Sequence, residues 1–243
     1  MQVDAFAVRL RPRAPFEAAD LGTRLCQSAA RDVYPCLLLA GLPIAMIVTA
    51  AAQWSVWLAL AMIWWAKPWL DRTILFVLSR AAFGQRTSLL DLWRDQRQVW
   101  WRHFVHTWTL RRLSPWRSLT QPVYQLEGLP LLKAGSRVRQ VRRRRAGSAL
   151  LVTGAYFTVE SCLVLSVIAL VLMLTPQAEV QPLFDIGDGT FSTFIVHTVT
   201  FAYAAVVIFL EPFYVAAGFA IYLGRRAELE AWDIEQEFRR AFA

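Results

Sequence analysis

The sequence predicts an all-α integral membrane protein with four transmembrane helices and amphipathic cytoplasmic helices. Hydrophobic residues make up 56% of the 243-residue chain, whereas soluble domains usually contain about 45–50%. The basic residues are also segregated, because seventeen of the 26 Lys and Arg lie in 66–148 and none lies in 34–65 or 149–223. Basic residues that flank apolar stretches follow the positive-inside rule. Both ends of the chain are therefore predicted to be cytoplasmic.

Residues 1–33 are predicted to form an N-terminal cytoplasmic or interfacial segment that contains one helix. Pro15 and Glu17 suit a first helical turn, so we expect the helix to begin after Ala14. Its apolar face should hold residues spaced by four, namely Leu21, Leu25 and Ala29. We expect this segment to lie at the membrane face and to lead into the first span. A protein-docking arm is the alternative.

Residues 34–70 are predicted to be the first transmembrane hairpin, with spans at 34–51 and 54–70. Each span is close to the lower length limit for crossing a bilayer. The short link between them contains no Gly or Pro, so one continuous helix is the alternative. We favour the hairpin because basic residues flank both ends of the pair and not its middle, which places both ends inside.

Residues 71–148 are predicted to be a basic cytoplasmic helical section. An interfacial helix too short to span is expected over 71–84, followed by an amphipathic helix over Ser88–Arg112. The three Pro and two Gly of 113–135 predict a loop-rich connector. The residues that the amphipathic helix should turn inward are Leu89, Trp93, Trp100, Phe104 and Trp108.

The connector ends in a run of six Arg within nine residues. Because the next residues enter the membrane, we interpret this run as a topology anchor, attracted to anionic headgroups by about 1 kcal/mol per basic residue near the surface. Specific binding of a lipid headgroup or of an acidic partner is the alternative. The candidate anionic-lipid contacts are Arg137, Arg139, Arg142, Arg143, Arg144 and Arg145.

Residues 149–223 are predicted to be the second transmembrane pair, with an external loop at 175–190 that contains no Lys or Arg. Pro212 is expected to bend the last span, because proline removes a helical hydrogen bond. Residues 224–243 should form a cytoplasmic amphipathic tail. We expect the acidic side of this tail to dock against the basic 71–148 section.

Two carboxylates inside the predicted spans, Glu160 and Glu211, form the candidate membrane polar site. Each is twelve residues from the cytoplasmic end of its span, so both lie about 18 Å deep and could meet. We expect the spans to offer them no basic partner, which favours a shared proton over two charges. A structural polar contact is the first interpretation. A proton or solute pathway and a contact with a partner subunit are the alternatives.

Recognisable catalytic, metal and cofactor motifs are not found in the sequence. It contains no GxSxG, no HExxH, no Gly-rich phosphate loop and no Cys–His arrangement. Its three Cys are scattered, and His103 and His106 have no carboxylate or Cys beside them at ligand spacing. The Arg-rich stretches flank apolar spans, which favours membrane contact over nucleic-acid binding. We therefore predict no catalytic residue, no cofactor and no metal.

Three segments carry a resemblance to a known family. They are RPRAPFEAADLG near the start, KPWLDRTILFVLSRAAFG with the later QPVYQLEG, and EPFYVAAGFAIYLGRRAELEAWDIEQEFRR at the end. Together they resemble a family of uncharacterised bacterial multi-pass inner-membrane proteins, encoded beside a MoxR-type AAA ATPase, von Willebrand factor A-type proteins and a transglutaminase-like membrane protein. The ending is also weakly similar to membrane domains of glycerophosphodiester phosphodiesterases. The resemblance implies a bacterial inner membrane and an envelope-related assembly, and it supplies no catalytic residues.

These observations favour a non-enzymatic inner-membrane scaffold or accessory subunit of a larger bacterial envelope complex. Its expected partners are membrane lipids with anionic headgroups and other proteins of that complex. One alternative is a transporter or channel component that uses Glu160 and Glu211. A second alternative is a lipid-handling membrane enzyme.

Overall fold

The computed structural model describes residues 13–101, 109, 114–175 and 193–230, and all regular structure within them is helical. Three helices in this part of the chain are long and apolar enough to cross a membrane: α2 (Ala30–Ala52), α8 (Ala146–Leu174) and α10 (Thr193–Glu230). The all-helical class predicted from the sequence is therefore confirmed, and the three long apolar helices fit a membrane protein.

The first helix, α1 (Pro15–Ser28), begins where the sequence predicted, directly after Ala14. Its proline occupies the first turn, where a missing N–H costs nothing. Of the expected apolar face, Ala29 is buried and Leu21 and Leu25 are partly buried. The buried residues within α1 itself are Ala18, Gly22 and Cys26. These small side chains allow α1 to lie very close to its neighbour.

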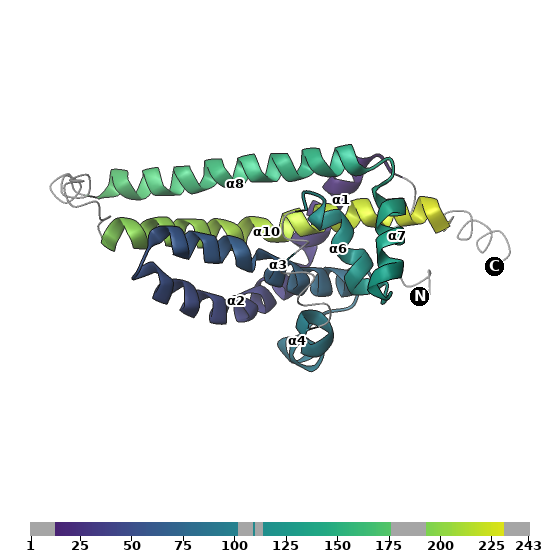
Figure 1. Ribbon diagram of the computed structural model, residues 1–243, viewed down its shortest axis with the longest axis horizontal. Helices are drawn as coiled ribbons and strands as arrows, with labels where there is room; N and C mark the ends of the chain where they lie inside the picture. Colours follow the sequence, from purple (N-terminus) through teal and green to yellow (C-terminus); the bar gives the residue numbers. More distant parts are fainter. Residues whose placement is uncertain (1–12, 102–108, 110–113, 176–192, 231–243) are drawn as a thin grey trace.

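Helix α2 is followed after a short turn by α3 (Val56–Ala81), and the two pack side by side (Figure 1). The separate interfacial helix expected over 71–84 is wrong, because most of this region belongs to α3, which runs unbroken from Val56 to Ala81. An interfacial helix would expose the charged side chains of Asp71 and Arg72 at its start. Both side chains are buried instead, and Arg72 donates hydrogen bonds to the carbonyl oxygens of Val99 and Gln98.

Within the described residues 88–101, shorter pieces replace the long amphipathic helix expected over Ser88–Arg112. They are α4 (Leu89–Arg94) and a π-helical turn η2 (Arg97–Trp101). Ser88 caps α4 by accepting a hydrogen bond from the Asp91 N–H, while the Asp91 carboxylate accepts one from the Ser88 N–H. These hydrogen bonds hold the pKa of Asp91 below its usual value. Trp100 is buried as expected, but Leu89 and Trp93 are exposed. The other expected inward residues, Phe104 and Trp108, lie outside the described residues.

The loop-rich connector expected over 113–135 is also wrong, because α6 (Arg117–Leu126) and α7 (Leu131–Arg142) occupy most of it. One proline and one glycine of this segment mark the boundary between the two helices. Pro130 is the N-cap of α7, and Gly128 adopts a positive φ of 67° in the turn before it. Pro122 lies within α6, where it removes one hydrogen bond without ending the helix.

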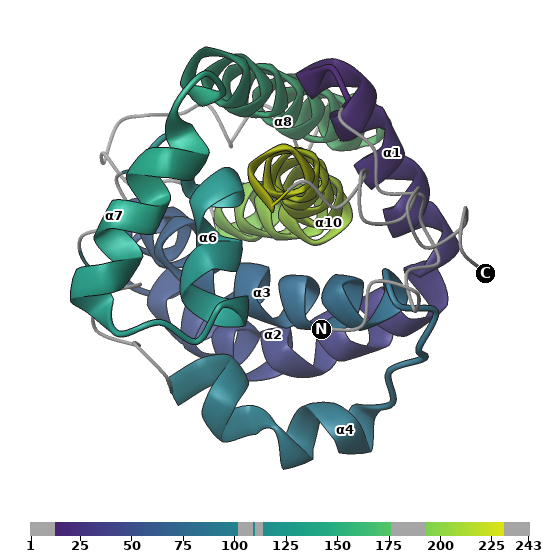
Figure 2. The same ribbon diagram turned by 90° about the vertical axis from the view of Figure 1, so that its right-hand side faces the viewer.

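Helix α10 is the centre of the fold (Figure 2). It continues through Pro212 to Glu230, and its second half is almost entirely buried from Leu210 to Tyr222. The elements that surround this half are α1, α6, α7 and the end of α3, which we call the collar. The α2–α3 turn and the start of α10 lie at the opposite end of the molecule (Figure 1).

Glycines allow two collar helices to approach α10 closely. A Cβ added at Gly22 of α1 would lie 2.3 Å from the carbonyl oxygen of Ala216. A Cβ added at Gly218 of α10 would lie 2.3 Å from the Cβ of Ser118 on α6. Since backbone atoms cannot rotate away as a side chain can, the first of these contacts leaves no room for a larger residue.

Substitution Gly22→Ala should therefore lower the stability of the purified protein. Overpacking of this kind costs about 1–3 kcal/mol, and here the obstructing atoms belong to the backbone of α10. Thermal unfolding in detergent would measure the change. The matched control is Gly154→Ala, because a Cβ at Gly154 on α8 meets nothing within 4 Å. Equal melting temperatures for the two variants would show that α1 is not packed on α10 in this way.

Candidate functional site

The two candidate acids meet at a lysine on a third helix. Lys67 on α3 lies with its Nζ 2.6 Å and 2.5 Å from the two carboxylate oxygens of Glu160 on α8. The same Nζ lies 3.1 Å from Oε2 of Glu211 on α10. Glu160 and Glu211 are thus brought to one place, as the depth count suggested.

An arginine from the collar extends this contact into a network. Arg117, the first residue of α6, places Nη2 2.5 Å from Oε1 of Glu211. Its Nε lies 2.8 Å from Oδ2 of Asp71, which is one turn beyond Lys67 on α3. We call these five residues, Lys67, Asp71, Arg117, Glu160 and Glu211, the charge cluster. It joins α3, α6, α8 and α10.

The presence of basic partners corrects the prediction that the spans offer the two acids none. Lys67 lies inside the predicted 54–70 span and pairs with both of them. The two carboxylates therefore have cations that balance their charge, and a proton shared between them is not needed. The signal available in the sequence was Lys67 itself, a lone basic residue within the predicted 54–70 span. Arg117 gave no such signal, because it lay in the segment taken for a loop.

The cluster is secluded from solvent. Its side chains are exposed by 7% at Lys67, 2% at Asp71, 9% at Arg117, 14% at Glu160 and 3% at Glu211. Burial acts to lower the pKa of Arg117, but the adjacent carboxylates of Asp71 and Glu211 outweigh it and raise that pKa above its ordinary value. The guanidinium is therefore a permanent cation. In such surroundings, removing one partner leaves another charge buried without compensation.

Aromatic rings and a threonine surround the cations. Lys67 Nζ lies 5.7 Å from the ring centre of Tyr203, and the Arg117 guanidinium lies 5.3 Å from that of Tyr214. Both distances suit cation–π attraction. The Tyr214 hydroxyl lies 3.2 Å from Oγ1 of Thr153, which also donates to the carbonyl oxygen of Pro115. The start of α6 is further fixed because Trp116 Nε1 donates to the carbonyl oxygen of Ala146 at 3.0 Å.

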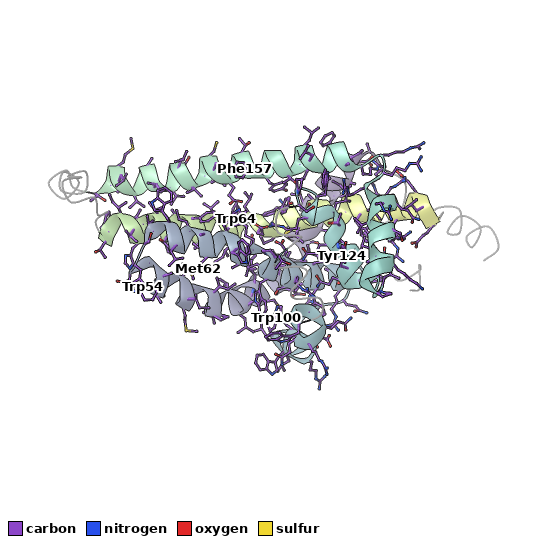
Figure 3. All side chains as sticks on the ribbon, in the orientation of Figure 1. Trp54, Met62, Trp64, Trp100, Tyr124 and Phe157 are labelled. Carbon is purple, nitrogen blue, oxygen red and sulfur yellow. The ribbon has the colours of Figure 1, made fainter. Side chains whose placement is uncertain are left out.

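A cavity of about 270 Å³ borders the cluster between α3, α8 and α10. Lys67, Arg117, Glu160 and Glu211 contribute to its wall. Figure 3 labels two further lining residues, Trp64 on α3 and Phe157 on α8. Its size suits about nine water molecules or a small polar solute, since water occupies about 30 Å³ per molecule in the liquid.

Two other polar side chains near Glu160 differ in their relation to the cavity. Tyr156 lines it, and its ring centre lies 5.6 Å from that of Tyr214. Ser161 is partly exposed and donates its hydroxyl to the carbonyl oxygen of Phe157 on its own helix at 2.9 Å. Ser161 does not line the cavity.

The six candidate lipid-contacting arginines divide into two groups. Arg137 pairs with Glu127 at 3.1 Å and with Glu230, while Arg145 pairs with Glu228. Arg142 stacks over the ring of Trp116 with 3.7 Å between guanidinium carbon and ring centre. The exposed members, which have the surface position that a headgroup contact requires, are Arg139, Arg143 and Arg144.

The acidic tail docks on the basic section where the chain is described. Glu228 and Glu230 at the end of α10 pair with Arg145 and Arg137. The Tyr222 hydroxyl of α10 also donates to Glu127 at 2.7 Å. The predicted docking is thus confirmed up to Glu230, and the residues beyond it lie outside the described part of the chain.

The cysteines are free thiols and are not part of the charge cluster. Cys26 and Cys36 are buried and Cys162 is exposed, all as free thiols. Burial raises the pKa of Cys26 to about 12, which suits an inert apolar filler. Among the residues that the structure describes, no three His, Cys, Asp or Glu side chains lie close enough to hold a metal ion. His103 and His106 lie outside that set.

Comparison with known proteins found no match to a family model, to a curated protein or to a solved structure. The cluster must therefore be interpreted from its own geometry.

Replacing the lysine at the centre of the cluster should be strongly destabilising. Lys67→Met removes the cation shared by Glu160 and Glu211, and breaking a buried pair in this way typically costs about 3–5 kcal/mol. Lys67→Met combined with Glu160→Gln should recover part of the loss, because one uncompensated charge is also removed. Unfolding in mixed micelles would measure these free energies.

The control is an ion pair on the surface of α1. Arg24 and Asp20 lie 3.5 Å apart with side chains exposed by 76% and 67%. Arg24→Gln should cost about 0–1 kcal/mol, as exposed pairs do. If Lys67→Met were as mild as Arg24→Gln, Lys67 would not be holding the cluster together.

Proposed function

We propose that this chain is a non-enzymatic scaffold or accessory subunit of a larger envelope complex in the bacterial inner membrane. The observation that carries the proposal is the internal pairing of the charge cluster. Each of its carboxylates contacts at least one of its two cations. A conducting site needs binding weak enough for a solute to leave. Tightly paired and buried charges instead suit a fixed joint between helices.

In this proposal the chain crosses the membrane four times, with both ends cytoplasmic. Helix α3 is the fourth span beside the three apolar ones. Its outer part, from Val56 to Ala66, is free of charge, and Lys67 is neutralised within the bundle rather than facing lipid. Trp54 and Trp57, exposed at the α2–α3 turn, suit the aromatic belt of the outer interface.

The depth of the charge cluster in the membrane supports a role in joining the membrane helices to the collar. Glu211 is eighteen residues from the start of α10 at Thr193, which is about 27 Å along the helix. Counted from Thr193 across a hydrocarbon thickness of about 30 Å, Glu211 lies near the inner boundary, where the collar begins, and not about 18 Å deep as the count from Leu223 predicted. Arg117 of the collar is bonded to it there.

A scaffold also needs surface for its partners, and α8 provides it. Only Ala149 and Val152 of its 29 residues are buried. Exposed apolar side chains such as Phe157 and Leu165 suit either lipid or the helix of another subunit. Membrane proteins associate through such faces by close packing rather than by the hydrophobic effect.

Transport is the second candidate, favoured by the cavity that borders Glu160 and Lys67. A polar cavity at membrane depth is a common feature of solute pathways. Four spans enclose little space unless the protein oligomerises, so this candidate requires more copies of the chain.

Replacing both acids, Glu160→Gln with Glu211→Gln, distinguishes the two candidates. The scaffold role predicts that the variant is recovered with a smaller assembly than the parent after gentle detergent extraction from the cells that produce it. Mass spectrometry of the purified material would measure this. Asp20→Asn at an exposed position is the matched control and should keep the full assembly. An intact assembly together with lost proton-coupled flux in proteoliposomes would instead support transport.

A further inference from the structure

An exposed apolar patch lies on the short helix that follows α3. Leu90 and Trp93 of α4 are exposed by 76% and 61%, and Leu89 by 44%. Trp101 at the end of η2 is also exposed. We call these four residues the α4 patch. Soluble surfaces rarely gather two large aromatics and two leucines in so short a segment, so the patch requires a covering surface.

The exposure of the α4 patch is built into the fold, because the opposite side of the same segment is firmly packed. Leu92, Val99 and Trp100 are buried. The Trp100 ring stacks on Trp69 of α3 with 5.0 Å between ring centres, and its Nε1 donates to Oγ1 of Thr73 at 2.9 Å. These contacts fix which side faces outward, and the patch cannot turn inward without breaking them.

Basic side chains border the patch. Arg86, Arg94 and Arg97 are exposed within a few residues of it. The acidic residues of the segment are Asp91, which pairs with Arg80 at 3.7 Å and with its helix cap, and Asp95. Exposed arginines beside Leu and Trp form the pattern of segments that lie in a membrane interface.

The patch lies at the level where α2 enters the bilayer. The N–H of Thr87, just before α4, donates to Oδ2 of Asp32 in the first turn of α2 at 3.0 Å. The exposed apolar surface of α2 begins six residues later at Leu38, about 9 Å along the helix. The headgroup region flanks the hydrocarbon at this level. Figure 1 shows α4 projecting from the side of the bundle beside α2 and α3, where it can reach lipid.

We propose that the α4 patch is an interfacial anchor that inserts into the inner leaflet, with its arginines bound to anionic phospholipid headgroups. Leu89, Leu90 and Trp93 lie at the boundary of headgroups and acyl chains. The arginines make the contact sensitive to the charge of the leaflet. The anchor would hold the collar against the membrane through α3. This inference rests on the membrane assignment and is independent of the scaffold role.

The test places a spin label at Leu90→Cys in a Cys162→Ser background, since the other two cysteines are buried. The full chain is reconstituted into vesicles of phosphatidylcholine and phosphatidylglycerol. Collision rates with oxygen, which concentrates in lipid, and with a water-soluble nickel chelate are measured by electron paramagnetic resonance. Controls are Leu42→Cys on the exposed face of α2 and Gln140→Cys on the exposed face of α7.

The anchor predicts that the label at position 90 has an oxygen-to-nickel ratio several-fold above that at position 140 and below that at position 42. A ratio equal to that at position 140 would overturn it, as the patch would face water. Low collision rates with both reagents would also overturn it, because a protein partner or second copy would then cover the patch. If position 42 itself faced water, the membrane assignment would fail rather than the anchor alone.

The charge requirement has its own test. Arg94→Gln with Arg97→Gln should move the label at position 90 toward the nickel reagent in the mixed vesicles, lowering the ratio about two-fold or more. In pure phosphatidylcholine the same double substitution should leave the ratio unchanged. Arg24→Gln on α1, also an exposed arginine, is the matched control and should have no effect in either vesicle. An equal response in the two lipids would overturn the role of anionic headgroups.

Discussion

The fold depends on the pairing of Lys67 and Arg117 with three carboxylates in a buried, weakly polar environment. None of these charges could stay in its place alone, because the transfer of an isolated ion from water costs several kcal/mol even after relaxation. Each therefore requires the helix that carries its partner. As Lys67 and Asp71 come from α3, Glu160 from α8, Glu211 from α10 and Arg117 from α6, four helices are held in one register. Apolar packing within a bilayer supplies no such registration, since lipid tails solvate leucine as well as a neighbouring helix does.

Small residues provide the second condition for this arrangement. The buried half of α10 contains Ala216, Ala217, Gly218 and Ala220, and α1 and α6 approach it at Gly22 and Ser118. Close approach of α6 is what allows Arg117 to reach Glu211 at 2.5 Å. The acidic end of α10 then fixes the far side of the collar through Glu228 and Glu230. A single helix thus links the membrane bundle to the collar, with an ion-pair contact at each end of the collar.

Local signals in the sequence were enough to predict the helices whose position is determined by nearby residues. The start of α1 follows from Pro15, and α8 and α10 follow from apolar runs of membrane length. The meeting of Glu160 and Glu211 followed from counting depth along antiparallel helices. The prediction errors arose where contact with a residue distant in the sequence decides whether a side chain is buried. Asp71 and Arg72 look like surface charges until their partners in α6 and η2 are known. Of the prolines in the supposed connector, Pro130 caps α7 and Pro122 lies within α6, and composition alone does not distinguish these positions from a loop.

The most direct test of this account is the interaction free energy between Arg117 and Glu211, obtained from a double-mutant cycle of Arg117→Met and Glu211→Gln. The free energy of unfolding in mixed micelles is measured for the parent, both single variants and the double variant. The account predicts a favourable coupling of about 1–3 kcal/mol, as found for residues in one buried network. Additive effects, with a coupling indistinguishable from zero, would contradict the claim that this pair joins the collar to the membrane helices.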